Sequence, residues 1–299
     1  LCFSLVVLMF ASCNSWLDVE PKSQVKDKDL YSSESGFKEA LAGVYSIMTQ
    51  EYLYGKELTF GMLGVLAQEW DYEPSEYADD KLYKYESTKP EIRIDSIWCG
   101  LYNAIANANK LLEEIDAKQS KFTGVNYEVI KGEALALRAY LHFDLLRVFG
   151  ASYAEKPDKM AIPYVTAYTS DVFPQKTVAE VIGKVLEDLT TASEYLKNDP
   201  MYTGKVVTET DDNGYLLNRQ VHLNYYAVKG LMARVYLYKK DYTNAARCAS
   251  EVVESGKFEW VEQANLTNEN MADVSFSSEH LFALNVVTLG NRVEKYFSG

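Results

Sequence analysis

Apolar residues recur every three or four positions along most of the chain, a spacing typical of amphipathic helices. The first clear example lies in residues 35–48, where one helical face would hold Phe37, Leu41, Val44, Tyr45 and Met48. The same spacing predicts further helices at residues 94–115, 127–150, 176–196, 223–240 and 242–255. We therefore predict a mainly α fold.

Two of the predicted helix ends carry signals of their own. The helix at 127–150 ends at Gly150, and glycine is common at the C-terminal end of a helix. Thr177 and Glu180 have the spacing of a capping box, in which each side chain binds a backbone N–H of the other residue. These signals place a helix end near residue 150 and a helix start near residue 177.

Two short segments predict a small amount of β structure. Asn213-Gly214 lies between alternating segments in residues 206–219, which is a signal for a tight hairpin. The apolar run HLFALNVV (280–287) is typical of a buried strand. Residues 209–220 also begin like a calcium loop, but Gln220 stands at the twelfth position, where such loops need an acidic residue. The hairpin is therefore preferred.

The last two predicted helices carry a repeat signature. Small and aromatic residues fall there at the spacing of the tetratricopeptide repeat, which is a stacked pair of helices: Ala233, Tyr236, Tyr242, Ala245 and Ala249. In such a pair the small residues let the helices approach closely and the rings fill the gaps. The signature predicts helix stacking and says nothing about a ligand.

The beginning of the chain predicts export and a lipid anchor. Leu5–Phe10 is apolar but too short to span a bilayer, which takes about 20 residues, and it has the length of a signal-peptide core. The small pair Ala11-Ser12 is followed directly by Cys13, the pattern of a bacterial lipoprotein. We predict a signal peptide at 1–12, acylation of Cys13 and a polar tether at 13–33. The alternative is a plain signal peptide with a chance cysteine.

The charge balance narrows the choice of partners. The 299 residues carry a formal net charge of −13, which argues against a nucleic-acid partner, because phosphate binding needs clustered Lys and Arg. It also argues against attraction to anionic lipids, which leaves the acyl chain as the membrane attachment. The 23 Tyr residues suit wet binding surfaces, because the ring offers an apolar face and a hydroxyl at low entropic cost. Alternatively, most of them pack helices together.

Cysteines and histidines give little sign of special chemistry. Cys99 and Cys248 lie inside helical patterns far apart in the sequence, and we favour buried free thiols over a pair, which the sequence leaves open. The three histidines have no metal-ligand spacing: His142, His222 and His280. We assign no metal site and no cofactor.

Six segments in order resemble one family, the SusD/RagB nutrient-binding outer-membrane lipoproteins of Bacteroidetes. CNSWLDVEP (13–21) is similar to the mature start of these proteins, and GFKEALAGVY (36–45) to their first helix. The later similar segments are IWCGLYNAIANANKLL (97–112), GEALALRAYLHFDLLRVFG (132–150), TVAEVIGKVLEDLTTASEYL (177–196) and NYYAVKGLMARVYLYKKDYTNAA (224–246). AIPYVT (161–166) also follows where members carry a short VP-containing stretch.

The resemblance implies a fold, a function and a location. Residues 34–299 would be the N-terminal part of a SusD-like helical domain with tetratricopeptide-like helix pairs, and the family's C-terminal region would be missing. The protein would capture oligosaccharides and deliver them to a SusC-like TonB-dependent transporter, without breaking a bond. It would sit on the outer membrane, held by its lipid and facing the cell exterior.

Residues 68–86 are the best sequence candidate for a sugar site. Four aromatic residues, Trp70, Tyr72, Tyr77 and Tyr83, alternate with acidic residues such as Asp71 in a segment without helical periodicity. Rings can stack on sugar faces, and carboxylates accept hydrogen bonds from hydroxyls. The alternative is a solvated acidic loop whose rings fold inward. Trp98, whose helical neighbours are apolar, is assigned to the core.

Two other functions stay open at this point. A surface glycoside hydrolase would need two facing carboxylates, and nothing among residues 69–80 marks such a pair, so we assign no catalytic residue. A scaffold of the tetratricopeptide type would bind only protein.

Overall fold

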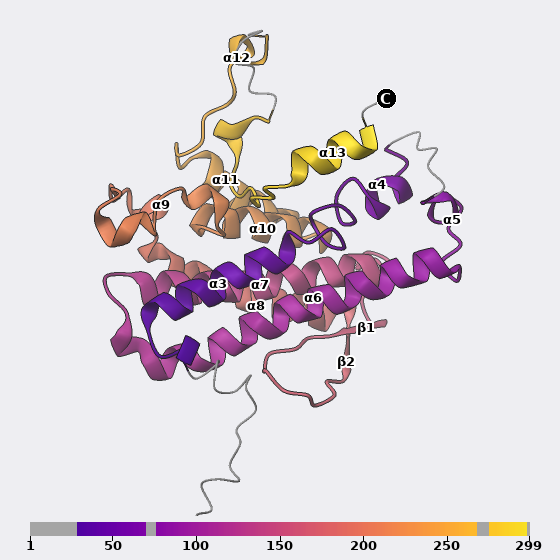
Figure 1. Cartoon of the computed structure of the whole chain (residues 1–299), viewed down its shortest axis with the longest axis horizontal. Helices are drawn as coiled ribbons and strands as arrows, with labels where there is room; N and C mark the ends of the chain where they lie inside the picture. The colour runs from indigo at the N-terminus through magenta and orange to yellow at the C-terminus, as the bar shows by residue number, and fades with distance from the viewer. Residues whose placement is uncertain (1–28, 70–75, 268–274, 298–299) are drawn as a thin grey trace, which may run out of the picture.

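The computed structural model describes residues 29–69, 76–267 and 275–297. Within these ranges the chain is mainly α-helical, as the spacing predicts, with one two-stranded sheet (Figure 1). The longer helices are α3 (Glu34–Met48), α6 (Thr88–Ile115), α7 (Asn126–Phe149), α8 (Val178–Tyr195), α10 (Tyr225–Tyr238), α11 (Tyr242–Val253) and α13 (Leu289–Phe297). The shorter ones are α4 (Met62–Leu66), α5 (Ala78–Lys81), η3 (Asp116–Lys121), η4 (Leu196–Asn198), α9 (Pro200–Thr203), η5 (Asp211–Gly214), η6 (Arg219–Val221), α12 (Gln263–Thr267) and η7 (Ser277–Glu279).

The long helices pack on one another nearly in chain order. Helix α3 packs on α6, α6 on α7, α7 on α8, α8 on α10 and α10 on α11 (Figure 1). Helix α7 therefore has neighbours on several sides, and most of its residues are buried. Several of its apolar side chains, among them Ile130, Leu137 and Leu141, have no exposed surface. None of the helices in the described ranges has the length and apolar character that crossing a bilayer requires.

Polar side chains inside α7 are paired, as buried polar groups must be. Arg138 donates from Nε and Nη2 to the two carboxylate oxygens of Asp188 in α8, both at 2.7 Å. The hydroxyl of Tyr164 donates to the same carboxylate at 2.6 Å. This arrangement ties α7 to α8 and to the residues after β1 (Met160–Pro163).

His142 is fixed in one neutral form beside this pair. The backbone N–H of Val165 donates to Nε2 at 3.0 Å, so Nδ1 carries the hydrogen that meets the Arg138 carbonyl at 2.8 Å. The ring stacks on Tyr164 with centroids 4.0 Å apart. Complete burial, which disfavours the charged ring, lowers the pKa of His142 to about 3.

A second buried cluster joins α7 to the segment that precedes α10. Glu133 is fully buried, accepts a hydrogen bond from the Tyr45 hydroxyl at 2.8 Å and pairs with Arg219 at 2.6 Å. Arg219 also pairs with the buried Asp199 at 2.9 Å. Burial acts to raise the pKa of Glu133, but the charges of Arg219 and His222 lower it to about 2. The cluster therefore holds this connecting segment against the helices.

Most predicted helix boundaries are confirmed, including the capping box. The Thr177 hydroxyl accepts the backbone N–H of Glu180 at 3.2 Å, and the Glu180 carboxylate accepts that of Thr177 at 2.7 Å. Gly150 is the residue that follows α7. Helix α6 begins at Thr88, ahead of the predicted start, because Pro90 is compatible with a first helical turn.

Both β predictions are wrong in position. Asn213-Gly214 belongs to η5, and Asp212 in that turn binds Lys38 and Asn126 instead of opening a hairpin. Residues 280–284 are half-buried and Val287 is exposed, and the segment forms no strand, because no strand of the described ranges lies beside it to complete its backbone bonds. The sheet instead pairs β1 with β2 (Gln175–Thr177) in antiparallel fashion.

The predicted helix pair is present, with two corrections. Helices α10 and α11 pack together and Ala245 is buried between them. Tyr242 is 63% exposed and does not fill a gap, and Ala249 is exposed as well. Cys99 and Cys248 are both unpaired thiols, and Cys99 is exposed where we expected burial. Trp98 packs against the core as predicted, with its ring 4.9 Å from that of Phe149.

Candidate functional site

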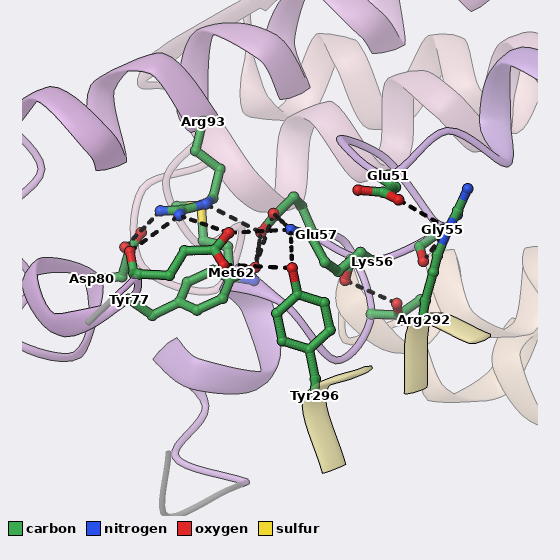
Figure 2. A network of polar contacts seen from close by, with 12 residues as sticks. Glu51, Gly55, Lys56, Glu57, Met62, Tyr77, Asp80, Arg93, Arg292 and Tyr296 are labelled. Carbon is green, nitrogen blue, oxygen red and sulfur yellow. Dashed lines mark hydrogen bonds and ion pairs between the residues drawn. The ribbon is translucent and has the colours of Figure 1, made fainter. Parts of the chain in front are cut away.

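The described part of the predicted sugar segment is anchored by a buried cluster of charged side chains. We call Lys56, Glu57, Tyr77, Asp80 and Arg93 the Glu57 cluster (Figure 2). The Tyr77 hydroxyl donates to the Glu57 carboxylate at 2.9 Å, and Lys56 Nζ lies 3.0 Å from the same group. Arg93 binds Asp80 at 2.6 Å and lies 4.2 Å from the centre of the Tyr77 ring. Helix α5 is thereby fixed to α6.

The Glu57 cluster also shapes the neighbouring elements. Glu57 Oε2 accepts the backbone N–H of Met62 at 2.9 Å, which satisfies the first amide of α4. Tyr296 of α13 reaches Lys56 with its hydroxyl at 3.1 Å, and Arg292 donates to the carbonyl of Thr49 at 2.9 Å (Figure 2). The segment between α3 and α4 is therefore held from both sides.

The structure contradicts the prediction for one site residue and does not describe three others. Tyr77 is only 2% exposed, and its ring is covered by Arg93, so it presents no face to a sugar. Burial and the neighbouring Glu57 charge raise the pKa of the Tyr77 hydroxyl. Trp70, Asp71 and Tyr72 lie outside the described residues, as does the predicted lipid site Cys13.

Tyr83 and its neighbour Tyr85 do face solvent. They are 49% and 44% exposed, with ring centres 6.4 Å apart and ring planes nearly perpendicular. The Tyr83 hydroxyl donates to the carbonyl of Leu66 at the end of α4 (3.2 Å) and accepts from Gln68 at 3.2 Å. Tyr83 matches the predicted exposure, and Tyr85 was not among the predicted residues.

Tyr85 lies at the edge of a cavity of about 850 Å³ that we call the α4–α10 cleft. Its walls come from α4, the first half of α6, the C-terminal end of α7 and helix α10. The cleft has five aromatic residues in its lining, Tyr54, Tyr85, Tyr140, Phe149 and Tyr238. Both the volume and the aromatic lining are typical of small-molecule sites in proteins.

The polar groups of the cleft centre on one carboxylate. Asp144 Oδ2 accepts from the Tyr54 hydroxyl at 2.8 Å, and Oδ1 accepts from Arg147 Nη1 at 2.8 Å. The Tyr54 ring lies 5.6 Å from that of Tyr140. Burial and the charge of Asp144 raise the pKa of Tyr54, so its hydroxyl stays protonated. Arg234 of α10 completes the charged lining.

The composition of the cleft suits binding better than hydrolysis. Asp144 is the only carboxylate among the described residues that line it, whereas glycoside hydrolysis uses two. Tyrosine faces and hydroxyls can instead contact both surfaces of a sugar, its C–H faces and its hydroxyl groups. No group of three or more His, Cys, Asp or Glu side chains within the described ranges is placed to hold a metal ion.

The sequence did not single out most of these residues. Tyr140, Asp144 and Arg147 lie in the helical pattern that predicts α7, and Arg234 and Tyr238 in the one that predicts α10. The available signal was a group of polar and aromatic side chains at the end of an otherwise apolar helix. That signal does not reveal which helices face each other across a cavity.

Comparisons with known proteins agree with this architecture. A SusD-like family model, described as "Starch-binding associating with outer membrane", matches residues 15–237. A SusD-like protein of Bacteroides ovatus is 23% identical over 251 residues, which are 82% of this chain and 40% of that protein. The chain therefore spans less than half the length of this relative.

Solved structures show the same fold. A SusD superfamily protein from Bacteroides fragilis matches with a TM-score of 0.65 and 21% identity, over 86% of this chain and 56% of that one. A laminarin-binding SusD-like protein matches with a TM-score of 0.55 and 21% identity, over 78% and 46%. Because the family model covers well over half of the sequence, the chain belongs to the SusD-like family.

Proposed function

We propose that this chain belongs to a cell-surface lipoprotein that captures oligosaccharides and delivers them to a SusC-like TonB-dependent transporter. The observation that carries the proposal is the α4–α10 cleft, with its tyrosine lining and a single carboxylate. Membership of a family described as starch-binding and outer-membrane-associated supports it, and one structural neighbour is named for laminarin binding. Acylation of Cys13 would provide the attachment to the outer membrane.

The binding step is tested by calorimetry with a panel of neutral and acidic oligosaccharides. We expect the protein to bind at least one glycan without cleaving it. Tyr85→Ala should weaken that binding, whereas Tyr168→Ala should not, because Tyr168 is similarly exposed (49% against 44%) but lies outside the cleft. Cleavage of the glycan would favour a hydrolase. If neither variant loses binding, the site lies elsewhere. If no glycan binds, a protein scaffold is favoured.

The anchor and the delivery step need separate experiments. Cys13→Ala should shift the protein from membrane to soluble fractions, and unchanged membrane retention of a processed variant would contradict the anchor. Co-purification of the acylated protein with a TonB-dependent transporter from the same cells would support delivery. A purified protein that binds glycan but never associates with such a transporter would leave only the capture step.

A further inference from the structure

The charge of the α4–α10 cleft differs in sign from that of the chain as a whole. The sequence has 43 Asp and Glu against 30 Lys and Arg, yet the charged residues that line the cleft are Asp144, Arg147 and Arg234. The lining therefore carries one net positive charge in a chain of net charge −13. A positively charged cleft raises the local concentration of negatively charged ligands.

The single carboxylate is already used by the protein. Asp144 Oδ1 binds Arg147 and Oδ2 binds Tyr54, so both oxygens have a protein donor. Asp144 itself is 8% exposed, which limits its access to a ligand. It neutralises Arg147 and leaves no second carboxylate in the lining to neutralise Arg234.

Arg234 is the unbalanced charge. It is exposed on α10, and it makes no ion pair or hydrogen bond with any residue that the structure describes. Burial and Asp144 together raise the pKa of the Tyr140 hydroxyl, while Arg234 and Arg147 act to lower it. Arg147, Arg234 and Tyr140 all line the cleft, so both guanidinium groups belong to the same cavity.

We propose that the cleft selects acidic oligosaccharides, with Arg234 as the group that binds the ligand's carboxylate or sulfate. This inference rests on the proposed glycan-binding function. A guanidinium can donate two parallel hydrogen bonds to either kind of anion, which a neutral sugar cannot exploit. The surrounding tyrosines would hold the sugar ring, while Arg147 stays paired with Asp144.

The test compares matched ligands on matched variants. The ligands are an oligogalacturonate, a sulfated oligogalactoside and a neutral oligogalactoside of the same length. The variants are Arg234→Gln and the control Arg247→Gln, which removes another exposed arginine, on α11 and outside the cleft. Both variants should melt like the parent protein, because both side chains are exposed and, among the described residues, Arg234 has no hydrogen-bond or ion-pair partner and Arg247 donates hydrogen bonds only to Asn244.

We expect an acidic ligand to bind more tightly than the neutral one, with the preference shrinking as salt is raised. Arg234→Gln should weaken acidic binding roughly tenfold, as for loss of a hydrogen bond to a charged group, and leave neutral binding unchanged. Arg247→Gln should change neither. The ligand that responds, galacturonate or sulfated, identifies the anion.

Each other result has a defined meaning. Equal binding of neutral and acidic ligands, or an Arg234→Gln variant that binds acidic ligand like the parent, would overturn the inference and leave glycan binding intact. Equal loss of neutral and acidic binding would also overturn it, because Arg234 would then serve sugars in general. Failure of every ligand to bind would instead count against the proposed function itself.

Discussion

The Glu57 cluster and the α4–α10 cleft contain the same kinds of side chain but differ in how far these side chains are covered. Each combines tyrosine with carboxylate and cationic groups, and each contacts the segment between α3 and α6. In the Glu57 cluster the tyrosine hydroxyl and the charges are bound to one another and covered. In the cleft, Tyr85 and Arg234 remain open to solvent. What separates a structural cluster from a binding surface here is whether its side chains are covered by the protein or open to solvent.

The largest effect should follow from opening the Glu57 cluster. Glu57→Gln would leave Lys56 and Arg93 without their shared partner in a buried setting, and breaking a buried ion pair typically costs about 3–5 kcal/mol. Urea unfolding measures the loss. Glu113→Gln is the control, because its carboxylate pairs with Lys110 on the surface and such pairs contribute little. Equal losses of stability in the two variants would show that the buried pairs of Glu57 contribute no more than a surface ion pair.

Acid should lower the stability of the fold through His142, a buried polar group of the core. His142 is buried as the neutral ring with a pKa of about 3, whereas an unfolded chain takes up its proton near 6.5. Its contribution to stability is therefore complete above pH 6.5 and is lost as pH falls towards 3, by about 1.4 kcal/mol per unit. Chemical denaturation between pH 7 and 4 measures this slope. A His142→Gln variant should show a shallower slope, and an identical one would contradict the assignment.

A smaller and more selective effect is expected for Tyr77→Phe. The substitution keeps the ring but removes the hydrogen bond to the buried Glu57 carboxylate, which typically costs about 1.5–3 kcal/mol for a charged partner. Thermal melting should shift down, while glycan affinity stays unchanged because the ring is covered. A loss of affinity without a loss of stability would return Tyr77 to the sugar site.

The smallest effect should be the reverse of that pattern. Tyr85→Ala should leave the melting temperature unchanged, because the side chain is 44% exposed. Glycan binding should weaken by about 0.5–1.5 kcal/mol, the range of an aromatic contact beyond area burial. Calorimetry on the parent and the variant measures the difference. Destabilisation of the fold by Tyr85→Ala would show that this ring also packs as part of the structure.

The sequence predicts the helices well because their signals are local. The spacing of Phe37, Leu41 and Val44 defines the buried face of α3, and Thr177 with Glu180 defines the start of α8. Each signal needs only residues within one or two helical turns. The SusD-like resemblance adds the order of these helices along the chain.

The candidate site is predicted much less well because its signals are not local. Tyr77 and Tyr83 occur in the same acidic, aromatic stretch, yet one is buried and one exposed. The difference arises from Glu57 and Arg93, which lie in separate segments and which the local pattern does not connect with either ring. Arg234 likewise acquires its meaning only when α10 is placed across the cleft from α7.

The buried cluster around Glu133 bears on how long the folded state lasts. The Tyr45 hydroxyl, which donates to Glu133, also accepts the backbone N–H of Leu223, 178 residues further along the chain. Contacts of such separation reward the chain only after a long loop has closed, so they tend to form late in folding. Interactions made after the folding barrier act mainly on the unfolding rate. The cluster should therefore govern the lifetime of the folded molecule more than the speed with which it forms.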